Sequence, residues 1–285
     1  MRHLASALLL ILAGAAAAAA QNAAPEAGTA PTTADVLCAG MMTTEDVPYD
    51  TYVISGEEAD PRTIFTQGDY IYINKGASQG AKVGDMFMIL RSQNDPYHVQ
   101  YYGEEHALAR ELGTMWRDIA RIRVVVVHPE VSIAQVSYSC SPVQRGDTVL
   151  PAVDYPAPAF KPLKDFDRFA PPSGKAQGRV VRAKEYAAVP DRGAIVYINL
   201  PDAKVGDYIR VFRPTAGKNT EIYQIGGMSD HVDGFGKTPV HYEPKDLPRE
   251  VVGEGVVLRV TKTSASVILF NELRAIYIGD QVEIE

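Results

Sequence analysis

The chain has 285 residues, of which 46% are hydrophobic and 22% are charged, and its formal net charge is −7. This length suffices for one large domain or two small ones, and the composition is that of a globular protein. We expect no nucleic-acid partner, because such proteins usually present a basic patch or stripe and the sequence contains no Lys/Arg cluster.

Residues 1–20 have the pattern of a cleaved secretory signal peptide. A positively charged start precedes the apolar run Leu4–Ala13, which is too short to span a bilayer, and alanines permit cleavage before Gln21. An uncleaved anchor is the alternative interpretation. No second apolar run reaches transmembrane length. We therefore expect an exported protein, in the periplasm or at the cell surface of a Gram-negative bacterium, with no transmembrane span in the mature chain.

Two segments are predicted to lack regular structure. Gln21–Asp35 is small, polar and Pro-containing, so we expect a disordered spacer over residues 21–37. Residues 151–177 contain six prolines, which resist both helices and central strands and favour an extended linker. Because similar sequence phrases occur on both sides, this Pro-rich linker is the expected boundary between a first repeat, residues 38–150, and a second repeat, residues 178–285.

The chain contains two cysteines, Cys38 and Cys140. An even pair in an exported protein is usually a disulfide, and this one would tie the N-terminal segment to the end of the first repeat. Two buried thiols are the alternative. Two cysteines this far apart supply too few ligands for a metal site.

One sequence phrase occurs in both repeats. YIN at Tyr72–Asn74 is followed by AKVGD at Ala81–Asp85, and YIN at Tyr197–Asn199 is followed by AKVGD at Ala203–Asp207. β-branched and aromatic residues flank each copy, which predicts strands separated by turns. A hairpin-like pair of β runs then leads to another Gly-Asp pair and a last short strand. The sequence therefore predicts an internal duplication of one β unit.

The Gly-Asp pairs are predicted to be structural turns that direct the chain back into the sheet. Glycine takes a positive φ without steric cost, and aspartate hydrogen-bonds to the local backbone. A catalytic or metal-binding role for the AKVGD aspartates is disfavoured, because they would occupy corresponding places in separate domains. The predicted turn residues are Gly84, Asp85, Gly146, Asp147, Gly206, Asp207, Gly279 and Asp280.

About five or six short strands in each repeat predict an all-β protein, with minor α structure in insertions, made of two small SH3-like or closed β-barrel domains in tandem. Closure of each barrel would remove exposed strand edges. Each repeat carries a long insertion, Ser92–Ala120 in the first and Pro214–Gly253 in the second. The first contains EEHALAREL, which predicts a short helix. Long loops on a rigid scaffold are where binding sites usually lie.

The two insertions hold the candidate binding residues. Exposed aromatic side chains could stack on sugars or anchor a protein partner, and the alternative is that they cap the open ends of the barrels. These aromatics are Tyr97, Tyr101, Tyr102, Tyr223, Phe235 and Tyr242. The second insertion also contains side chains of metal-ligand types. Their spacing matches no defined metal motif, so a solvated loop is the favoured interpretation; they are Asp230, His231, Asp233 and His241.

The segment YINKGASQGAKVGDMFMILR, followed by ARIRVVVVHPEVSIAQV and VQRGD, resembles the C-terminal β-barrel domain of flagellar assembly protein T. The resemblance is stronger in the first repeat than in the second. Related modules occur in other bacterial envelope proteins, some of which also carry LysM peptidoglycan-binding repeats. The resemblance implies a tandem of this β-barrel module in a secreted envelope protein, and it implies no functional residues.

No HExxH, P-loop or GxGxxG-helix pattern occurs in the sequence. We therefore expect no enzyme and no cofactor, but an exported envelope protein that acts as a binding or assembly scaffold through loops of its two β-barrels. A peptidoglycan-binding or glycan-binding module is the first alternative, and an enzyme without a recognisable motif is the second. The expected partners are envelope proteins or cell-wall glycan.

Overall fold

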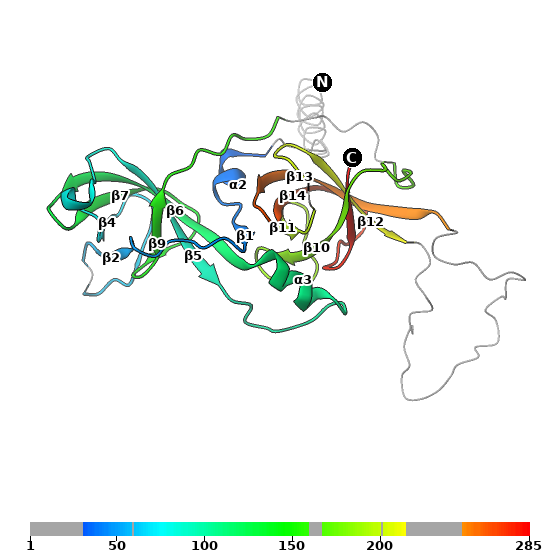
Figure 1. Cartoon of the computed structure of the whole chain (residues 1–285), viewed down its shortest axis with the longest axis horizontal. Coiled ribbons are helices and arrows are strands. Elements are labelled where there is room, and N and C mark those ends of the chain that lie inside the picture. The colour runs from blue at the N-terminus through cyan, green and yellow to red at the C-terminus, as the bar shows by residue number, and fades with distance from the viewer. Residues whose placement is uncertain (1–30, 59, 160–166, 201, 215–246) are drawn as a thin grey trace, which may run out of the picture.

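The computed structural model describes residues 31–58, 60–159, 167–200, 202–214 and 247–285 (Figure 1). These residues form an all-β protein with a few short helices, as the sequence predicts. No helix in this part of the chain is both long and apolar enough to cross a membrane. The predicted signal peptide and most of the predicted spacer lie outside the described residues.

The second repeat forms a closed barrel of antiparallel strands in the order β10-β11-β14-β13-β12-β15. Alternate residues of the strands fill its interior, such as Ile209 with Val211 and Val267 with Leu269, which is the two-residue period expected of strands with one face inward. The strands are β10 (Gln177–Ala183), β11 (Ile195–Ile198), β12 (Tyr208–Pro214), β13 (Arg249–Val260), β14 (Ala265–Glu272) and β15 (Gln281–Ile284).

The first repeat has the same strand order, β2-β4-β7-β6-β5-β9, position for position. Val53 joins its two ends, because the Val53 N–H and carbonyl bond the Gly146–Asp147 corner beside the last strand. Val180 of the second barrel makes the equivalent pair of bonds with the Gly279–Asp280 corner. The structure thus confirms the all-β class and one closed barrel, in the second repeat, while the first repeat is a seven-stranded sheet, including β1 (Met41–Thr43), that follows the same strand order. The strands are β2 (Val53–Gly56), β4 (Tyr70–Ile73), β5 (Met86–Gln93), β6 (Thr114–Val127), β7 (Ser132–Ser139) and β9 (Thr148–Pro151).

Three short strands lie outside this common plan. β1 (Met41–Thr43) pairs with the start of β6, and β3 (Ile64–Phe65) pairs with β8 (Val143–Gln144). The pairing of β1 with β6 brings the N-terminal segment alongside the first insertion.

The short helices correct one boundary of the sequence analysis. Residues Thr33–Leu37, assigned to the disordered spacer, form helix α2. Thr32 and Asp35 make a capping box, in which the Asp35 carboxylate accepts the Thr32 N–H at 2.7 Å and the Thr32 hydroxyl accepts the Asp35 N–H at 3.1 Å. α3 (Glu105–Leu112) is the helix predicted from EEHALAREL, and η2 (Ala77–Gln79) is a single 3-10 turn between β4 and β5.

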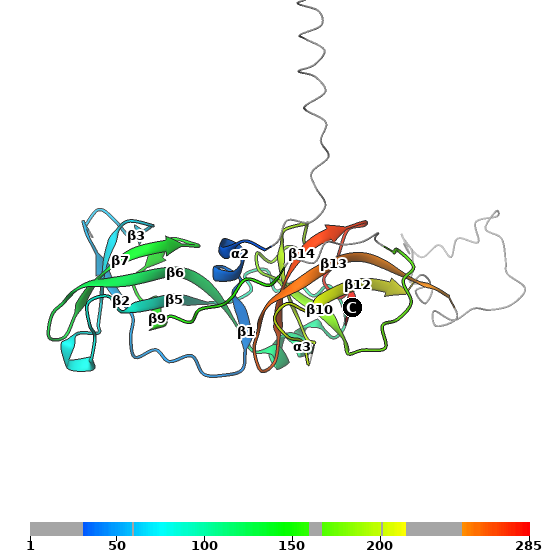
Figure 2. The ribbon, with the colours of Figure 1, turned by 90° about the horizontal axis from the view of Figure 1, so that it is seen from above.

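The two repeats lie side by side along the long axis of the molecule, with α2, β1 and α3 between them (Figures 1 and 2). We call this region the junction. Apolar side chains from α2, β1, α3 and β6 pack against the outer face of the second barrel, so the β11 residues Ile195–Ile198 are buried on both sides. The junction cluster contains Val36, Ala39, Met42, Leu112, Met115, Val181, Ile195, Tyr197, Val256, Leu258 and Ile268. The Pro-rich linker is therefore not the only connection between the repeats.

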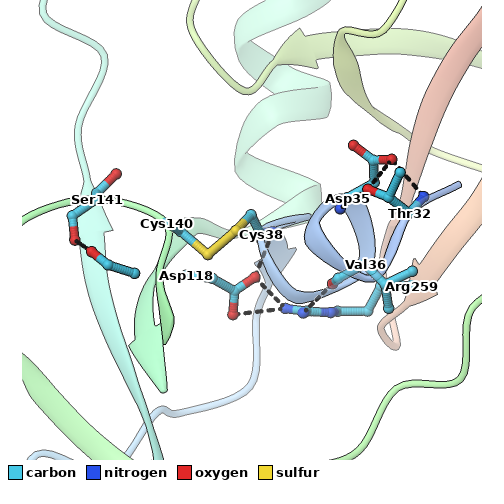
Figure 3. The surroundings of a disulfide bond; sticks show 10 residues. Thr32, Asp35, Val36, Cys38, Asp118, Cys140, Ser141 and Arg259 are labelled. Carbon is cyan, nitrogen blue, oxygen red and sulfur yellow. Dashed lines mark hydrogen bonds and ion pairs between the residues drawn. A yellow bond between two sulfur atoms is a disulfide. The ribbon is translucent and has the colours of Figure 1, made fainter. Parts of the chain in front are cut away.

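A disulfide and a buried ion pair hold the junction together (Figure 3). Cys38, at the end of α2, is bonded to Cys140 after β7, as the sequence predicts, with their Cα atoms 5.6 Å apart. Asp118 of β6 and Arg259 of β13 approach to 3.0 Å, with side chains only 4% and 3% exposed respectively. Arg259 also donates to the Val36 carbonyl at 3.2 Å. These contacts make the two barrels one body rather than two domains on a flexible strap.

Candidate functional site

The Gly-Asp pairs are structural turns, as predicted. At Asp85, Asp147, Asp207 and Asp280 the carboxylate accepts the backbone N–H three residues earlier, at 2.7–2.9 Å. The glycine before each aspartate has φ between 85° and 100°, a conformation that favours glycine over any residue with a Cβ atom. The local backbone uses these carboxylates, which leaves them poorly suited to catalysis.

A second duplicated contact explains why the repeats share more than the turn. Arg91 at the end of β5 donates to both carboxylate oxygens of Asp147, at 2.6 and 2.7 Å, and to the Pro142 carbonyl at 2.9 Å. Arg213 at the end of β12 bonds Asp280 and a carbonyl in the same way. Bidentate Arg-carboxylate pairs are among the strongest polar contacts in proteins. These pairs lock the last strand of each barrel.

The YIN asparagines are also structural. Asn74 accepts the Tyr52 N–H, and Asn199 accepts the Arg179 N–H, each at 2.6 Å and each from the segment that begins its barrel. The whole repeated phrase therefore specifies the barrel rather than a site.

One sequence pattern was missed in the sequence analysis. Gly76–Gly80 reads GASQG, which fits the GxSxG pattern of a hydrolase nucleophile elbow. In the structure this segment is the η2 turn rather than a strand–turn–helix, and the exposed Ser78 hydroxyl donates to Glu130 at 2.9 Å. A serine whose partner is a carboxylate, with no imidazole contact among the described residues, is not an activated nucleophile.

The predicted binding aromatics of the first insertion have different roles. Tyr97 is 68% exposed and Tyr101 is also exposed. Tyr102 instead packs against the core of the second barrel and lies over Gly279, with the Arg179 guanidinium 5.7 Å from its ring centroid. Tyr102 thus closes a barrel end, which is the alternative that the sequence left open. The other predicted aromatics and the metal candidates lie outside the described residues; they are Tyr223, Phe235, Tyr242, Asp230, His231, Asp233 and His241.

The junction contains a cavity of about 660 Å³, within the size range of small-molecule sites. It lies between the first insertion and the start of the second barrel, where α3 runs beside β10 (Figure 1). Both repeats and the N-terminal segment contribute to it. Its lining consists of Met42, Gln93, Asn94, Asp95, His98, His106, Ala109, Arg110, Gly113, Thr114, Met115, Arg182 and Tyr186.

An ion-pair network forms one side of this junction cavity. Arg182 bonds the Asp95 carboxylate and lies 3.5 Å from the fully buried Glu105 carboxylate, which accepts the Tyr101 N–H at 2.6 Å. Burial would raise the pKa of Asp95, but the Tyr97 N–H and the Arg182 guanidinium outweigh it and hold that pKa below its ordinary value. Arg182 is therefore neutralised by two carboxylates.

Three basic side chains line the cavity from its exposed side: His98, His106 and Arg110. His106 and Arg110 are one helical turn apart on α3, so they share a face. The Arg110 Nε donates to the His106 carbonyl at 3.2 Å. This contact orients the guanidinium while leaving its two terminal nitrogens without a partner among the described residues.

The cavity lining also contains residues whose backbone conformation or unpaired polar atoms destabilise the fold. Four non-glycine residues of the described chain have positive φ, and two of them, His98 (51°) and Tyr186 (56°), line this cavity. The Gln93 amide oxygen and the Tyr186 hydroxyl are shielded from solvent without a partner among the described residues. Strained backbone and unpaired polar groups each cost about 1–3 kcal/mol and cluster at functional sites.

The described lining of the cavity combines polar and apolar side chains. Its hydroxyl and imidazole groups belong to Thr114, Tyr186, His98 and His106. Within the described ranges, no group of three His, Cys, Asp or Glu side chains could hold a metal ion. What remains is a cleft with a basic rim and buried apolar side chains, including Met42 and Met115, in its wall.

Sequence reasoning expected binding residues in the first insertion, where His98 and His106 lie. It could not assemble the cavity, because the lining comes from segments that are distant in the chain. Compared with known proteins, the chain matches no protein-family model and no curated protein sequence.

Proposed function

We propose that the protein is a non-enzymatic, exported scaffold of the bacterial cell envelope that binds its partner at the junction between its two β-barrels. The observation that carries this proposal is the junction cavity itself, which both repeats build. A disulfide and a buried ion pair fix the junction in which the cavity lies, which favours a preformed site. The resemblance of the first repeat to a barrel of flagellar assembly protein T supports a place in the envelope.

Export is supported by the disulfide, because such bonds persist in oxidising compartments and are rare in the cytosol. The test is to express the full chain in a Gram-negative bacterium, fractionate the cells, and alkylate the protein with a maleimide that shifts its mobility. The proposal predicts a periplasmic or surface-located product, shortened at its N-terminus, whose cysteines do not react until a reductant is added. A full-length cytosolic product with two reactive thiols would overturn export.

The binding role is tested by photo-crosslinking in cells. A photoreactive amino acid at position 110, on the cavity rim, is expected to give a discrete adduct with an envelope protein. The same amino acid at position 82 is the control, because Lys82 is exposed on the AKVGD turn of the first repeat and does not line the cavity. Equal crosslinking from both positions would contradict a junction site. Retention on isolated cell-wall sacculi, with no protein adduct, would favour the glycan-binding alternative.

A further inference from the structure

We infer that the junction cavity binds an organic anion, namely a carboxylate carried on a small apolar body. This inference rests on the proposed function, since it names the ligand chemistry of the same site. The argument comes from the charges of the lining, from its apolar wall, and from the groups that have no partner.

The uncommitted charge of the lining is positive. Asp95 is the only acidic residue that lines the cavity, and Arg182 neutralises it. Arg182 also lies 3.5 Å from the buried Glu105 carboxylate, which is outside the lining, so this network holds one guanidinium against two carboxylates. Arg110 has no carboxylate partner among the described residues, and the imidazoles of His98 and His106 also line the cavity. Arg110 is therefore the charged group of the described lining that is left to attract an anion.

The geometry of the rim suits a carboxylate. A guanidinium offers a planar pair of donors that matches the two oxygens of a carboxylate, and the Nε contact to His106 already restricts how the Arg110 fork is oriented. Burial and the nearby Asp95 carboxylate raise the pKa of Tyr186 to about 12, so its hydroxyl keeps its proton and stays a donor. The lining is thus rich in donors and has one neutralised acid.

The apolar part of the lining suits an apolar body. Met42 of β1 and Met115 of β6 are cross-strand partners, and both are buried in the junction cluster. Ala109 of α3 also lines the cavity. Methionine side chains are flexible and polarisable, and adapt to ligands of irregular shape. A ligand with a carboxylate at Arg110 and an apolar group against the methionines would use both halves of the cavity.

This chemistry has two natural sources, a free small carboxylic acid and the C-terminal carboxylate of a peptide. The test uses isothermal titration calorimetry on the mature, disulfide-bonded chain at low ionic strength. Hexanoate represents the free acid. The tripeptide acetyl-Ala-Ala-Leu with a free carboxylate represents the peptide terminus, and its C-terminal amide is the uncharged match.

We expect saturable binding of hexanoate, of the tripeptide acid, or of both, and at least about tenfold weaker binding of the amide. Arg110→Gln should weaken binding of the acid by about tenfold or more, whereas Arg110→Lys should retain part of it. Lys82→Gln removes an exposed positive charge outside the cavity and should leave affinity unchanged. Unaltered melting temperatures of the variants establish that they are folded.

Several results would overturn the inference. They are the absence of binding by either acid, equal affinity for acid and amide, and unchanged affinity in folded Arg110→Gln. If neither acid binds while the photo-crosslink at position 110 persists, the anion inference fails and the scaffold function stands. If the crosslink also fails, the proposed junction site falls with it.

Discussion

The buried ion pair at the junction yields the sharpest stability prediction. Asp118 lies 3.0 Å from Arg259 and also accepts the Gly40 N–H at 2.7 Å. Asp118→Ala leaves a guanidinium and a backbone N–H buried without their partner. Breaking one side of a buried pair typically costs about 3–5 kcal/mol. Each kcal/mol shifts the melting temperature of a protein of this size by about 2–4 °C, so we expect a decrease of about 6–20 °C.

The matched control is an exposed ion pair between the repeats. Arg117 of β6 contacts Glu185, just after β10, but the Glu185 side chain is 64% exposed. Exposed pairs contribute about 0–1 kcal/mol, so Glu185→Gln should have little effect. Thermal unfolding of both variants, followed by circular dichroism at pH 7 with the disulfide intact, makes the comparison. Similar melting temperatures for the two variants would refute the claim that the junction pair is structurally important.

A rescue experiment tests the physical reason. Replacing both partners, with Asp118→Leu and Arg259→Met, removes the unpaired charge and leaves apolar side chains in an apolar cluster. Such replacements are often neutral or stabilising. The double variant should therefore melt above Asp118→Ala. If it melts lower still, the loss in the single variant does not come from an uncompensated charge.

Three further predictions concern the disulfide, the glycine turns and the stability of the protein in acid. Reducing the disulfide, which spans 102 residues, should lower the free energy of unfolding by up to about 4.7 kcal/mol, measured by urea titration with and without reductant; an unchanged midpoint would contradict this. Gly279→Ala should lower the melting temperature more than Gly84→Ala does. Both glycines have positive φ, but a Cβ atom at Gly279 would also lie 2.6 Å from Tyr102. Equal decreases in the two variants would refute this reasoning. Burial would raise the pKa of Glu283, but the Arg249 guanidinium and a backbone N–H outweigh it and lower that pKa. Its stabilisation is therefore complete above the unfolded value near 4.5 and is lost as the pH falls through the lower folded value. Glu283→Gln should flatten the loss of stability in acid urea titrations, and an equally steep loss would count against it.

The strand arrangement of each repeat was predictable because it depends on short sequence patterns that occur in both repeats. Strand alternation, the YIN-AKVGD phrase and the Gly-Asp corners each act over a few residues, and in the structure Asn74, Arg91 and Asp147 do the same work as Asn199, Arg213 and Asp280. The disulfide was predictable by elimination, since the chain has only two cysteines.

The junction was not predictable, because it depends on contacts between distant segments. Val36 was assigned to a spacer because the residues before it are small and polar, yet it is buried against the second barrel. One signal was present: Ile195–Ile198 is apolar on both faces, which indicates a strand covered on both sides. The charges of Asp118 and Arg259 gave no such signal, because each strand carries other charged residues, such as Arg117 in β6 and Glu254 in β13.

The bond from Arg259 to the Val36 carbonyl spans 223 residues and has a consequence for the order of folding. During synthesis, and during any passage through a membrane pore, the segment that emerges first must wait for almost the last strands before it can be seated. Contacts between such distant residues form slowly, because a long loop has to close first. Cys38 has no partner in the chain until Cys140 has been synthesised, so a folding chain exposes a thiol near its N-terminus that is open to oxidation by another molecule. Docking of the N-terminal segment onto the second barrel should therefore be a late and slow step in the folding of this protein.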